Sequence, residues 1–456
     1  NWGIKIGEAA ETRFYVAYNN ISQEVPGSLS LSDALNRPES VLTGNLAGDY
    51  GRDIRSLRVS NVTSFEAGDG VTVDLGGYGQ WRELFHPIFQ VLDQESWNGG
   101  VFARTRVKGS LGGHRNEAML GLNARTGTTD ALQFVNLRGS RGAKTADGDQ
   151  DATQIDLYGE NRFFVTNEHS LVAGAQFIHA GRDYTNNLNP AASADRDYNS
   201  VSPKLGWIWD YQPGAQAFFS VSRSYEPPTF SELVQSDVTG YVPLDAQSGW
   251  TGEIGTRGSS GRWAWDLTAY HSRIENELLG YTVNPTIPAA TFNAGNTVHQ
   301  GLELGLDLEI GQGWLFSAKD DRLVLRQVYT LSDFNFDGDP QYGDNRIAGI
   351  PLHLYAAELR YEDARGFHLA PRLEWAPEGA WVDHANTLQS PSYITFGFGA
   401  GVEVRKGVEL FLDARNLFDE RYVSNASTVT DARTASTAVF YPGEGRSVFV
   451  GLKAAF

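Results

Sequence analysis

One acidic segment of the sequence has the spacing of a calcium-binding loop. Asp333, Asn335, Asp337 and Asp344 occupy positions 1, 3, 5 and 12 of such a loop, and Gly338 occupies position 6. Side-chain oxygens at this spacing wrap around one hard cation such as Ca²⁺. Position 12 holds Asp where the longer Glu is usual, and the flanking residues alternate like strands. A solvated acidic loop therefore remains the alternative to a calcium site.

Arginine and aromatic residues near predicted strand ends could bind a bulky, anionic, partly aromatic ligand. The candidates are Trp81 with Arg82, Arg182 with Tyr184, and Arg223 with Tyr225. Adjacent strand residues point to opposite faces, so only one member of the Trp81–Arg82 pair can face a given side. The alternative for each candidate is a solvated charge on a barrel wall or an aromatic side chain at a membrane interface.

No combination of residues predicts catalysis. The chain has no cysteine, which excludes thiol catalysis, disulfides and cysteine-ligated metal sites, and its 9 histidines form no His-Glu-x-x-His pattern. No P-loop or Gly-x-Ser-x-Gly motif is present. The 37 basic and 55 acidic residues give a net charge of −18, which argues against nucleic acid as a partner. We expect neither an enzyme nor a resident cofactor.

The residues between these candidates alternate between apolar and polar side chains almost throughout the 456-residue chain. Leu302, Leu304, Leu306 and Leu308 fall on one face of an extended strand, whereas a helix would scatter the charged residues between them around its circumference. This alternation predicts an all-β fold.

The connections between the predicted strands fall into two classes. Short turns include 66–70, 166–169, 212–214, 258–261, 311–313 and 405–407, and long polar loops include about 22–49, 129–148, 185–197, 226–246, 335–349 and 425–436. Strict alternation of the two classes is typical of a transmembrane antiparallel up-and-down β-barrel with short periplasmic turns and long extracellular loops. About 19 strands are expected, and bacterial barrels close with an even number, so at least one more strand is expected before Asn1.

Tryptophans lie beside several short turns. Trp207 and Trp209 precede one turn, Trp263 and Trp265 follow another, and Trp314 follows a third. This placement predicts an aromatic girdle at the periplasmic headgroup level. Ordinary core tryptophans are the alternative.

Several segments, in this order along the chain, resemble the TonB-dependent outer-membrane receptors. They are 226–233 (EPPTFSEL), 253–258 (EIGTRG), 292–295 (FNAG) with 301–303 (GLE), 416–422 (NLFDERY), and 441–446 (YPGEGR) followed by alternation to the terminal Phe456. Within the family, 23–29 and 343–351 look most like the ferric-dicitrate and ferric-siderophore branch. Residues 1–456 would then be one barrel domain.

The resemblance implies a barrel of about 22 strands occluded by an N-terminal plug, of which this chain would lack the plug and about three strands. We expect the sequence to be part of a longer receptor; a processed natural product is the alternative. The implied function is active uptake of a ferric siderophore or similar iron chelate through a monomeric barrel in the outer membrane of a Gram-negative bacterium. The implied partners are the TonB–ExbB–ExbD energy-transducing complex, reached through the missing N-terminal region, and outer-membrane lipid with lipopolysaccharide.

Several other functions remain open. A plugless passive channel would conduct small solutes without tight binding, and relatives of the same architecture take up cobalamin, sugars, haem or redox cofactors. Haem is disfavoured because no histidine lies between Tyr225 and Trp250. A barrel enzyme would need a positioned nucleophile and base, and a soluble multi-sheet binding protein would not need detergent.

Overall fold

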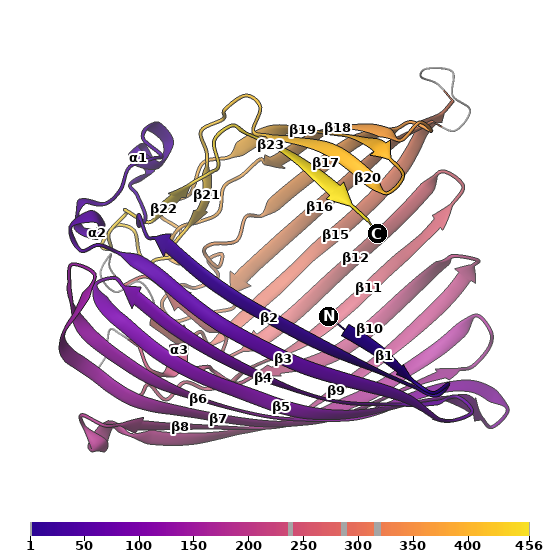
Figure 1. Cartoon of the computed structure of the whole chain (residues 1–456), viewed down its shortest axis with the longest axis horizontal. Coiled ribbons are helices and arrows are strands. Elements are labelled where there is room, and N and C mark those ends of the chain that lie inside the picture. The colour runs from indigo at the N-terminus through magenta and orange to yellow at the C-terminus, as the bar shows by residue number, and fades with distance from the viewer. Residues whose placement is uncertain (1, 236–239, 284–289, 314–320, 456) are drawn as a thin grey trace.

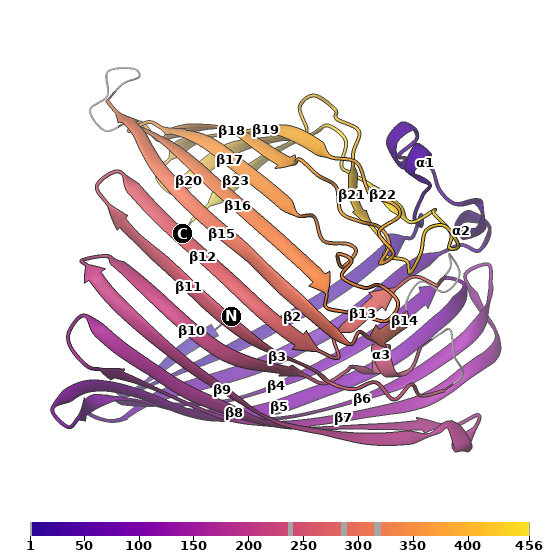
Figure 2. The ribbon, with the colours of Figure 1, turned by 180° about the vertical axis from the view of Figure 1, so that it is seen from behind.

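The described residues form an open barrel made from one antiparallel sheet. The structure, a computed structural model, describes residues 2–235, 240–283, 290–313 and 321–455. The sheet has 19 strands, and each pairs with the next strand of the sheet along the chain (Figures 1 and 2). The predicted all-β, up-and-down architecture and its strand number are confirmed. No helix in the described residues is long and apolar enough to cross a membrane.

The sheet strands run from the N-terminal to the C-terminal edge in chain order. They are β1 (Trp2–Ile6), β2 (Ala10–Glu24), β3 (Gly51–Gly68), β4 (Val71–Pro87), β5 (Gln90–Leu111), β6 (His114–Leu137), β7 (Ser140–Phe164), β8 (His169–Asn186), β9 (Ala194–Gln212), β10 (Ala215–Glu226), β11 (Gln247–Ser260), β12 (Trp263–Glu275), β15 (Asn296–Gln312), β16 (Arg322–Phe336), β17 (His353–Glu362), β18 (Phe367–Ala376), β19 (Tyr393–Arg405), β20 (Val408–Arg415) and β23 (Ser447–Ala454).

Smaller elements lie in the connections. They are α1 (Leu31–Asn36) and α2 (Thr43–Ala47), the 3-10 turn η1 (Pro190–Ala192), α3 (Phe230–Leu233), and the short paired strands β13 (Leu278–Tyr281) with β14 (Ala290–Asn293) and β21 (Val423–Ala426) with β22 (Phe440–Pro442).

The two ends of the barrel differ in their connections. At one end, here the turn end, the connections are 7–9, 69–70, 112–113, 165–168, 213–214, 261–262, 313–321, 363–366 and 406–407. At the other end, the loop end, most connections are long and carry the helices and small sheets (Figures 1 and 2).

The alternation of short turns with long loops is not strict. The predicted loop 129–148 is wrong, because β6 continues to Leu137 and β7 begins at Ser140, with Arg138 and Gly139 as a tight turn at positive φ. Only residues 88 and 89 separate β4 from β5. Residues 129–148 instead form the end of the long β6–β7 hairpin, which lies on the left of Figure 1.

Cross-strand rows define the two faces of the wall, because directly paired residues share a face. One row across β4 to β9 reads Leu75–Ala103–Leu122–Leu157–Phe177–Val201. Its large side chains are 42 to 57% exposed. The adjacent row begins with Ser64, Asp74 and Arg104 and is polar. The apolar face is therefore the outer face, and the polar face lines the lumen.

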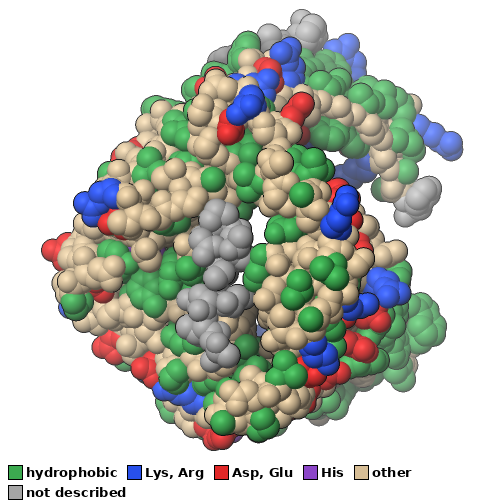
Figure 3. All heavy atoms as spheres, turned by 90° about the vertical axis from the view of Figure 1, so that its left-hand side faces the viewer, with side chains coloured by type: hydrophobic (Ala, Val, Ile, Leu, Met, Phe, Trp, Pro, Cys, Tyr) green, Lys and Arg blue, Asp and Glu red, His purple; other side chains and the backbone are tan. Residues whose placement is uncertain are grey.

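The two edges of the sheet are not paired with each other. β1 pairs only with β2, and β23 only with β20, among the described residues. Apolar side chains near both edges are exposed, including Val16 (65%) and Val450 (69%). The wall is consequently open along one seam, which Figure 3 shows as the open side of a C-shaped outline.

The predicted aromatic residues lie on the outer face beside the turn end. His169 stacks on Trp207 and Trp209, with ring centroids 5.7 and 5.8 Å away. Trp263 is 51% exposed and pairs with Leu308 of the outer face. Trp314 lies outside the described residues. The placement matches the predicted girdle.

Candidate functional site: an arginine wall in the lumen

Five arginines face the lumen near the loop end of β3 to β9. In order of pairing, the rows that contain them read Arg58–Gln80–Asn98–Gly127–Ala152–Arg182–Arg196, Ser56–Arg82–Ser96–Thr129–Gln150–Tyr184–Ala194, and Ser60–Tyr78–Gly100–Arg125–Gln154–Ala180–Tyr198. We call this surface the arginine wall. Its three rows contain amide, hydroxyl and aromatic side chains but no carboxylate.

The outer face at the same height carries the opposite charge. Its rows contain Glu83, Glu95, Asp130, Asp149, Asp151, Asp183, Asp195 and Asp197. Strand alternation keeps these carboxylates away from the lumen, as with Asp183 between Arg182 and Tyr184. The wall therefore separates charge, and its lumen side is positive.

Arg182 and Arg196 are a directly opposed pair of like charges on β8 and β9. Arg196 forms an ion pair with Asp245 and donates from Nη1 to the carbonyl oxygen of Leu244 (2.8 Å). Arg182 donates from Nε to the carbonyl oxygen of Pro228 (3.1 Å) and forms no ion pair with a described residue. Like charges opposite each other destabilise a sheet. The loop above offsets this repulsion only in part, because its carboxylate Asp245 pairs with Arg196 and not with Arg182.

Tyrosines support the same loop from below. Tyr184 and Tyr198 are each 4% exposed. The Tyr184 ring stacks on Tyr241 with a centroid distance of 6.5 Å, and the Tyr198 hydroxyl donates to Leu244 O (3.0 Å). Burial raises the pKa of Tyr241. Tyr184 thus positions the loop, and direct contact between Tyr184 and a ligand would require the loop to move.

Side-chain amides fasten this loop to its neighbour, 276–295. The Asn293 amide bonds both backbone groups of Asp245, accepting from N at 2.8 Å and donating to O at 2.9 Å. The Gln235 amide makes the same two bonds to Thr291, at 2.8 and 2.9 Å. Each amide imitates a β-bridge, so the described parts of the two loops are joined at two points above the arginine wall.

The arginine wall combines uncompensated guanidinium groups with neutral hydrogen-bonding side chains. Arg58 and Arg125 are exposed to the lumen, and neither forms an ion pair with a described residue. Gln154, opposite Arg125, donates to Asp156 (2.9 Å). An anion with several oxygens could bind more than one guanidinium here, and the partial cover of the loops would strengthen the attraction.

The predicted ligand-binding residues fall on both faces. Arg82 and Arg182 belong to the arginine wall, and Tyr184 lies within it but is buried. Trp81 is on the outer face, where it pairs with Trp97 and donates from Nε1 to Glu95 (3.1 Å). Strand alternation thus sends Arg82, not Trp81, to the lumen.

Arg223 and Tyr225 have the parity of the outer face, although Arg223 donates from Nη1 to Ser200 Oγ (2.5 Å), which has the parity of the lumen face on β9. They share the parity of Phe219, which pairs with the exposed Ile254 of the outer face, and the Arg223 guanidinium lies 5.9 Å from the Tyr225 ring centroid. Ligand binding by Arg223 and Tyr225 stays a prediction. Their outward direction follows from the register of β10, which two residues of sequence cannot reveal.

The candidate calcium residues are already bonded within the protein. Asp333 pairs with Arg346 (3.3 Å) and accepts from Gln300 (3.0 Å), and Asp344 accepts from the backbone N of Gly338 (2.9 Å). Asn335 forms a backbone bridge with Arg346, and no contact involving the Asp337 side chain joins it to the other three. Among the described residues, no three His, Cys, Asp or Glu side chains could hold one metal ion. Calcium binding stays a prediction without support from this geometry.

The opposite wall of the lumen is charge-compensated. A chain of alternating charges runs across β15 to β20 and ends in the loop that follows: Asp307, Arg326, Glu358, Arg372, Asp413, Arg415 and Glu444, with successive contacts of 2.8 to 3.7 Å. Every arginine in this series of alternating charges has a carboxylate partner, in contrast to the arginines of the arginine wall.

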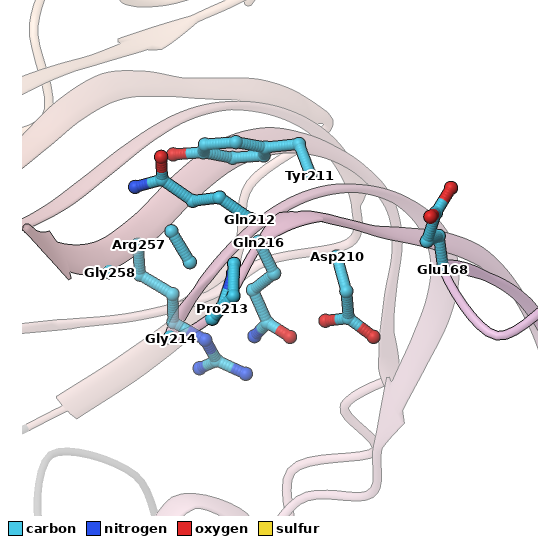
Figure 4. Close-up of a pocket in the computed structure, with 10 residues that line it drawn as sticks. Glu168, Asp210, Tyr211, Gln212, Pro213, Gly214, Gln216, Arg257 and Gly258 are labelled. Carbon is cyan, nitrogen blue, oxygen red and sulfur yellow. The ribbon is translucent and has the colours of Figure 1, made fainter.

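A separate cavity of about 740 Å³ lies at the turn end (Figure 4). Asp210, Gln216 and Arg257 line it together with the turn residues Pro213 and Gly214. The arginine wall lies near the opposite end of β8 and β9, so this cavity is not part of it.

The apolar outer face, short turns, long loops and polar lumen define a transmembrane β-barrel of the outer-membrane class. The chain belongs to the TonB-dependent receptor-like β-barrel family, whose family model matches residues 1–417. This membership places the protein in the outer membrane of a Gram-negative bacterium, with the loop end extracellular and the turn end periplasmic. The family is one of receptors, not of enzymes.

Known proteins resemble parts of the chain. The ferrioxamine receptor of Yersinia enterocolitica is 24% identical over 309 residues, which cover 65% of this chain and 39% of the receptor. The probable TonB-dependent siderophore receptor PiuA of Acinetobacter baumannii is 27% identical over 301 residues, which cover 53% of this chain and 39% of PiuA. The chain thus spans about two fifths of the length of these relatives.

Solved structures share the fold. The ferric citrate transporter FecA superposes with a TM-score of 0.81 at 16% identity, covering 98% of this chain and 68% of FecA. The ferric yersiniabactin receptor FyuA of Yersinia pestis superposes with a TM-score of 0.77 at 14% identity, covering 99% and 68%.

Sequence reasoning missed Arg58, Arg125 and Arg196. Arg58 and Arg125 lack the nearby aromatic residue that marked the other candidates, whereas Arg196 has Tyr198 at the same spacing as Arg182 and Tyr184 and was overlooked. Assigning each strand residue to a face by alternation from the apolar outer rows would have found all three. Arg125, for example, shares the lumen face with Asn123, whereas Leu122 lies on the outer face.

Proposed function

We propose that the protein is an outer-membrane receptor that actively takes up an anionic metal chelate of the ferric-siderophore class. The arginine wall carries this proposal, because it places Arg58, Arg82, Arg125 and Arg182 in the lumen below the extracellular loops, with no carboxylate partner in the described part of the chain. The resemblance to siderophore and ferric citrate receptors supports it.

The chemistry of the wall fits such a ligand. Ferric chelates present carboxylate, phenolate or hydroxamate oxygens, and guanidinium groups bind such oxygens with paired, charge-assisted hydrogen bonds. Gln80, Asn98 and Gln154 in the same rows offer neutral donors and acceptors for the rest of the ligand. A neutral sugar would gain little from the arginines, and a cationic ligand would be repelled.

The proposed energy source is the TonB–ExbB–ExbD complex, reached from the periplasmic side. The proposed working unit is a monomer surrounded by outer-membrane lipid and lipopolysaccharide. The proposal needs no resident cofactor, because transport changes no covalent bond in the ligand.

Uptake of ⁵⁵Fe-labelled chelates tests the proposal. The full-length receptor is expressed in an iron-starved strain lacking its own receptors, with and without a functional TonB gene. We expect accumulation of anionic chelates only with TonB, and no accumulation of a cationic chelate of similar size. A panel of ferric citrate and a ferric catecholate, with a charge-neutral ferric trihydroxamate for comparison, then narrows the ligand.

Other outcomes would overturn the proposal. Entry that does not require TonB, together with large salt-dependent conductance in planar bilayers, would identify a passive channel. TonB-dependent uptake of cobalamin, a sugar or a redox cofactor without uptake of any iron chelate would reassign the substrate.

A further inference from the structure

One carboxylate reaches the arginine wall from the loop above it. Asp245 Oδ1 forms an ion pair with Nη2 of Arg196, whereas the other four arginines of the wall have no carboxylate partner among the described residues. The other carboxylate in the described part of this loop, Glu232, instead accepts from the backbone N (2.6 Å) and Oγ1 (2.9 Å) of Thr229. The state of Asp245 therefore decides whether Arg196 is free to bind a ligand.

The backbone of Asp245 is held separately from its carboxylate. The Asn293 amide bonds both backbone groups of Asp245, at 2.8 and 2.9 Å. The Asp245 side chain is 57% exposed, and its contact with Arg196 uses only Oδ1. Arg196 also donates from Nη1 to the carbonyl oxygen of Leu244 (2.8 Å), so it keeps a partner when the carboxylate leaves. The carboxylate can consequently rotate away from Arg196 without unfolding the loop.

Arg182 lies beside Arg196 at a directly paired position of β8 and β9. Directly paired residues of an antiparallel sheet have Cα atoms about 5 Å apart, so one ligand with several oxygens can reach both guanidinium groups. Among the described residues, Arg182 donates only to the carbonyl oxygens of Pro228 and Gly181. A ligand bound to Arg182 is thus already placed next to the ion pair of Arg196 with Asp245.

The competition between Asp245 and a ligand depends on the charge of the ligand. Asp245 is tethered to the site, so its effective concentration at Arg196 is on the order of millimolar or above, and a dilute anion with one charge does not displace it. A ligand with several charged oxygens is itself held by Arg182 and competes for Arg196 from there. The ion pair is partly exposed and therefore weak, so this exchange costs little.

We infer that Asp245 is an internal competitor for anionic ligands, which holds Arg196 until a charged oxygen of the ligand replaces it. The identity of the natural ligand rests on the proposed function, but the exchange itself can be measured with a small polyanion. A ligand that cannot displace Asp245 meets a wall with one guanidinium fewer, whereas a ligand with several charges recovers it.

Calorimetric titration of the purified full-length receptor with inorganic pyrophosphate tests this inference. Pyrophosphate carries several charged oxygens and no iron, so its binding does not depend on the natural chelate. We expect Asp245→Asn to bind pyrophosphate about fivefold more tightly than wild type, because the anion no longer competes with a carboxylate. The gain should vanish when Arg196→Gln is compared with Arg196→Gln/Asp245→Asn, since Asp245 acts through Arg196.

Asp195→Asn is the matched control for the change in net charge. Asp195 precedes Arg196 in the chain and is exposed on the outer face, where it pairs with Asp183. Its loss should change the affinity for pyrophosphate less than about twofold, because the wall separates it from the lumen. Heat-dependent gel mobility should show every variant folded.

Three outcomes would overturn the inference. They are equal affinity of wild type and folded Asp245→Asn, an equal gain in Asp195→Asn, and no binding of pyrophosphate to any of these proteins. Uptake of ⁵⁵Fe-labelled chelates reports separately on the proposed function. A receptor that takes up no iron chelate but shows the gain in Asp245→Asn would refute the proposed function alone, and uptake of anionic chelates without that gain would refute the inference alone.

Discussion

Arg182 and Arg196 lie directly opposite each other on β8 and β9 with both guanidinium groups on the lumen face. A sheet gains nothing from this arrangement, because like charges at directly paired positions repel. Asp245 neutralises Arg196 from the loop above, while the bonds of Arg182 to described residues run only to backbone carbonyl oxygens. The residual positive charge is a cost to the empty barrel and an attraction for an anionic ligand.

Replacing Arg182 by Gln should weaken binding of an anionic chelate by about 10- to 100-fold, because one charge-assisted contact is lost. Titration of the ligand against purified receptor, followed by intrinsic fluorescence, measures the affinity. The same variant should not lose stability, since it relieves repulsion with Arg196.

Arg326→Gln is the matched control for that experiment. Arg326 also faces the lumen, but Asp307 and Glu358 neutralise it. Its loss should change affinity less than about threefold, since its charge is already compensated. If both variants weaken binding equally, the arginine wall has no special role.

The amide of Asn293 should control the order of the loop above the arginine wall. Asn293→Ala removes both bonds to the backbone of Asp245, which is the carboxylate that pairs with Arg196. We expect hydrogen exchange in 240–246 to accelerate by about tenfold or more, corresponding to a loss of about 1–2 kcal/mol of local stability. Asn386→Ala, which breaks the equivalent pair of bonds to Arg346, should leave 240–246 unchanged.

Alternation along the chain was enough to predict the barrel and its strand number, because each strand must show one apolar and one polar face. The prediction of loops failed where strands continue beyond the apolar part of the outer face. In β6 near Arg138 and Gly139, apolar residues such as Phe134 and Val135 occupy adjacent positions and therefore both faces, so the alternation disappears although the hydrogen-bonded ladder continues. Composition cannot distinguish such a hairpin from a loop.

The site was less predictable than the fold, because its residues are brought together by register. Arg82 and Arg182 were found from single strands, but their relation to Arg125 and Arg196 requires the pairing of β4 to β9. Motif segments gave more information about structure than about ligand. Asn416 of the NLFDERY segment is buried, has φ of 44°, and bonds Glu420 and the carbonyl oxygen of Glu444.

Calcium should leave the loop around Asp344 unchanged if Asp333 and Asp344 keep their hydrogen bonds to the protein when Ca²⁺ is present. The calcium interpretation predicts slower proteolysis within 333–346 on adding Ca²⁺ and reversal by a chelator. The present bonds of Asp333 to Arg346 and of Asp344 to Gly338 predict no change. Limited proteolysis with Ca²⁺, with Mg²⁺ and with chelator decides between the two.

Asp74 should be the carboxylate of the lumen wall whose loss costs most stability. It is 1% exposed and accepts from Ser64 (2.6 Å), Arg104 (2.8 Å) and Arg106 (3.2 Å). Asp74→Asn would leave two facing guanidinium groups without a counter-charge, so we expect a loss of about 2 kcal/mol after allowance for their partial exposure. Asp307→Asn, which breaks a half-exposed pair at 3.5 Å, should cost less than about 1 kcal/mol in the same thermal unfolding experiment.

Acid should loosen the loops at the extracellular end through His384. The ring is 1% exposed, lies 5.4 to 5.8 Å from the rings of Phe336, Tyr342 and Phe292, and has no partner for Nε2 among the described residues. Burial lowers the pKa of His384 from 6.5 to about 4, although the nearby carboxylates of Asp383, Glu277 and Asp339 oppose this shift. The folded loops therefore hold the neutral ring.

The sign of the effect follows from this lowered pKa. Above about pH 6.5 the ring is neutral in both open and closed loops, so stability does not depend on it. Between about pH 6.5 and 4 only the opened loops gain the proton, so closed loops should lose up to about 3 kcal/mol relative to neutral pH. Protection of the amides in 377–392 against hydrogen exchange, measured relative to the intrinsic rate at each pH, should fall over this range in wild type and in the surface control His179→Gln. In His384→Leu it should not, and persistence of the acid effect in that variant would assign it to other groups.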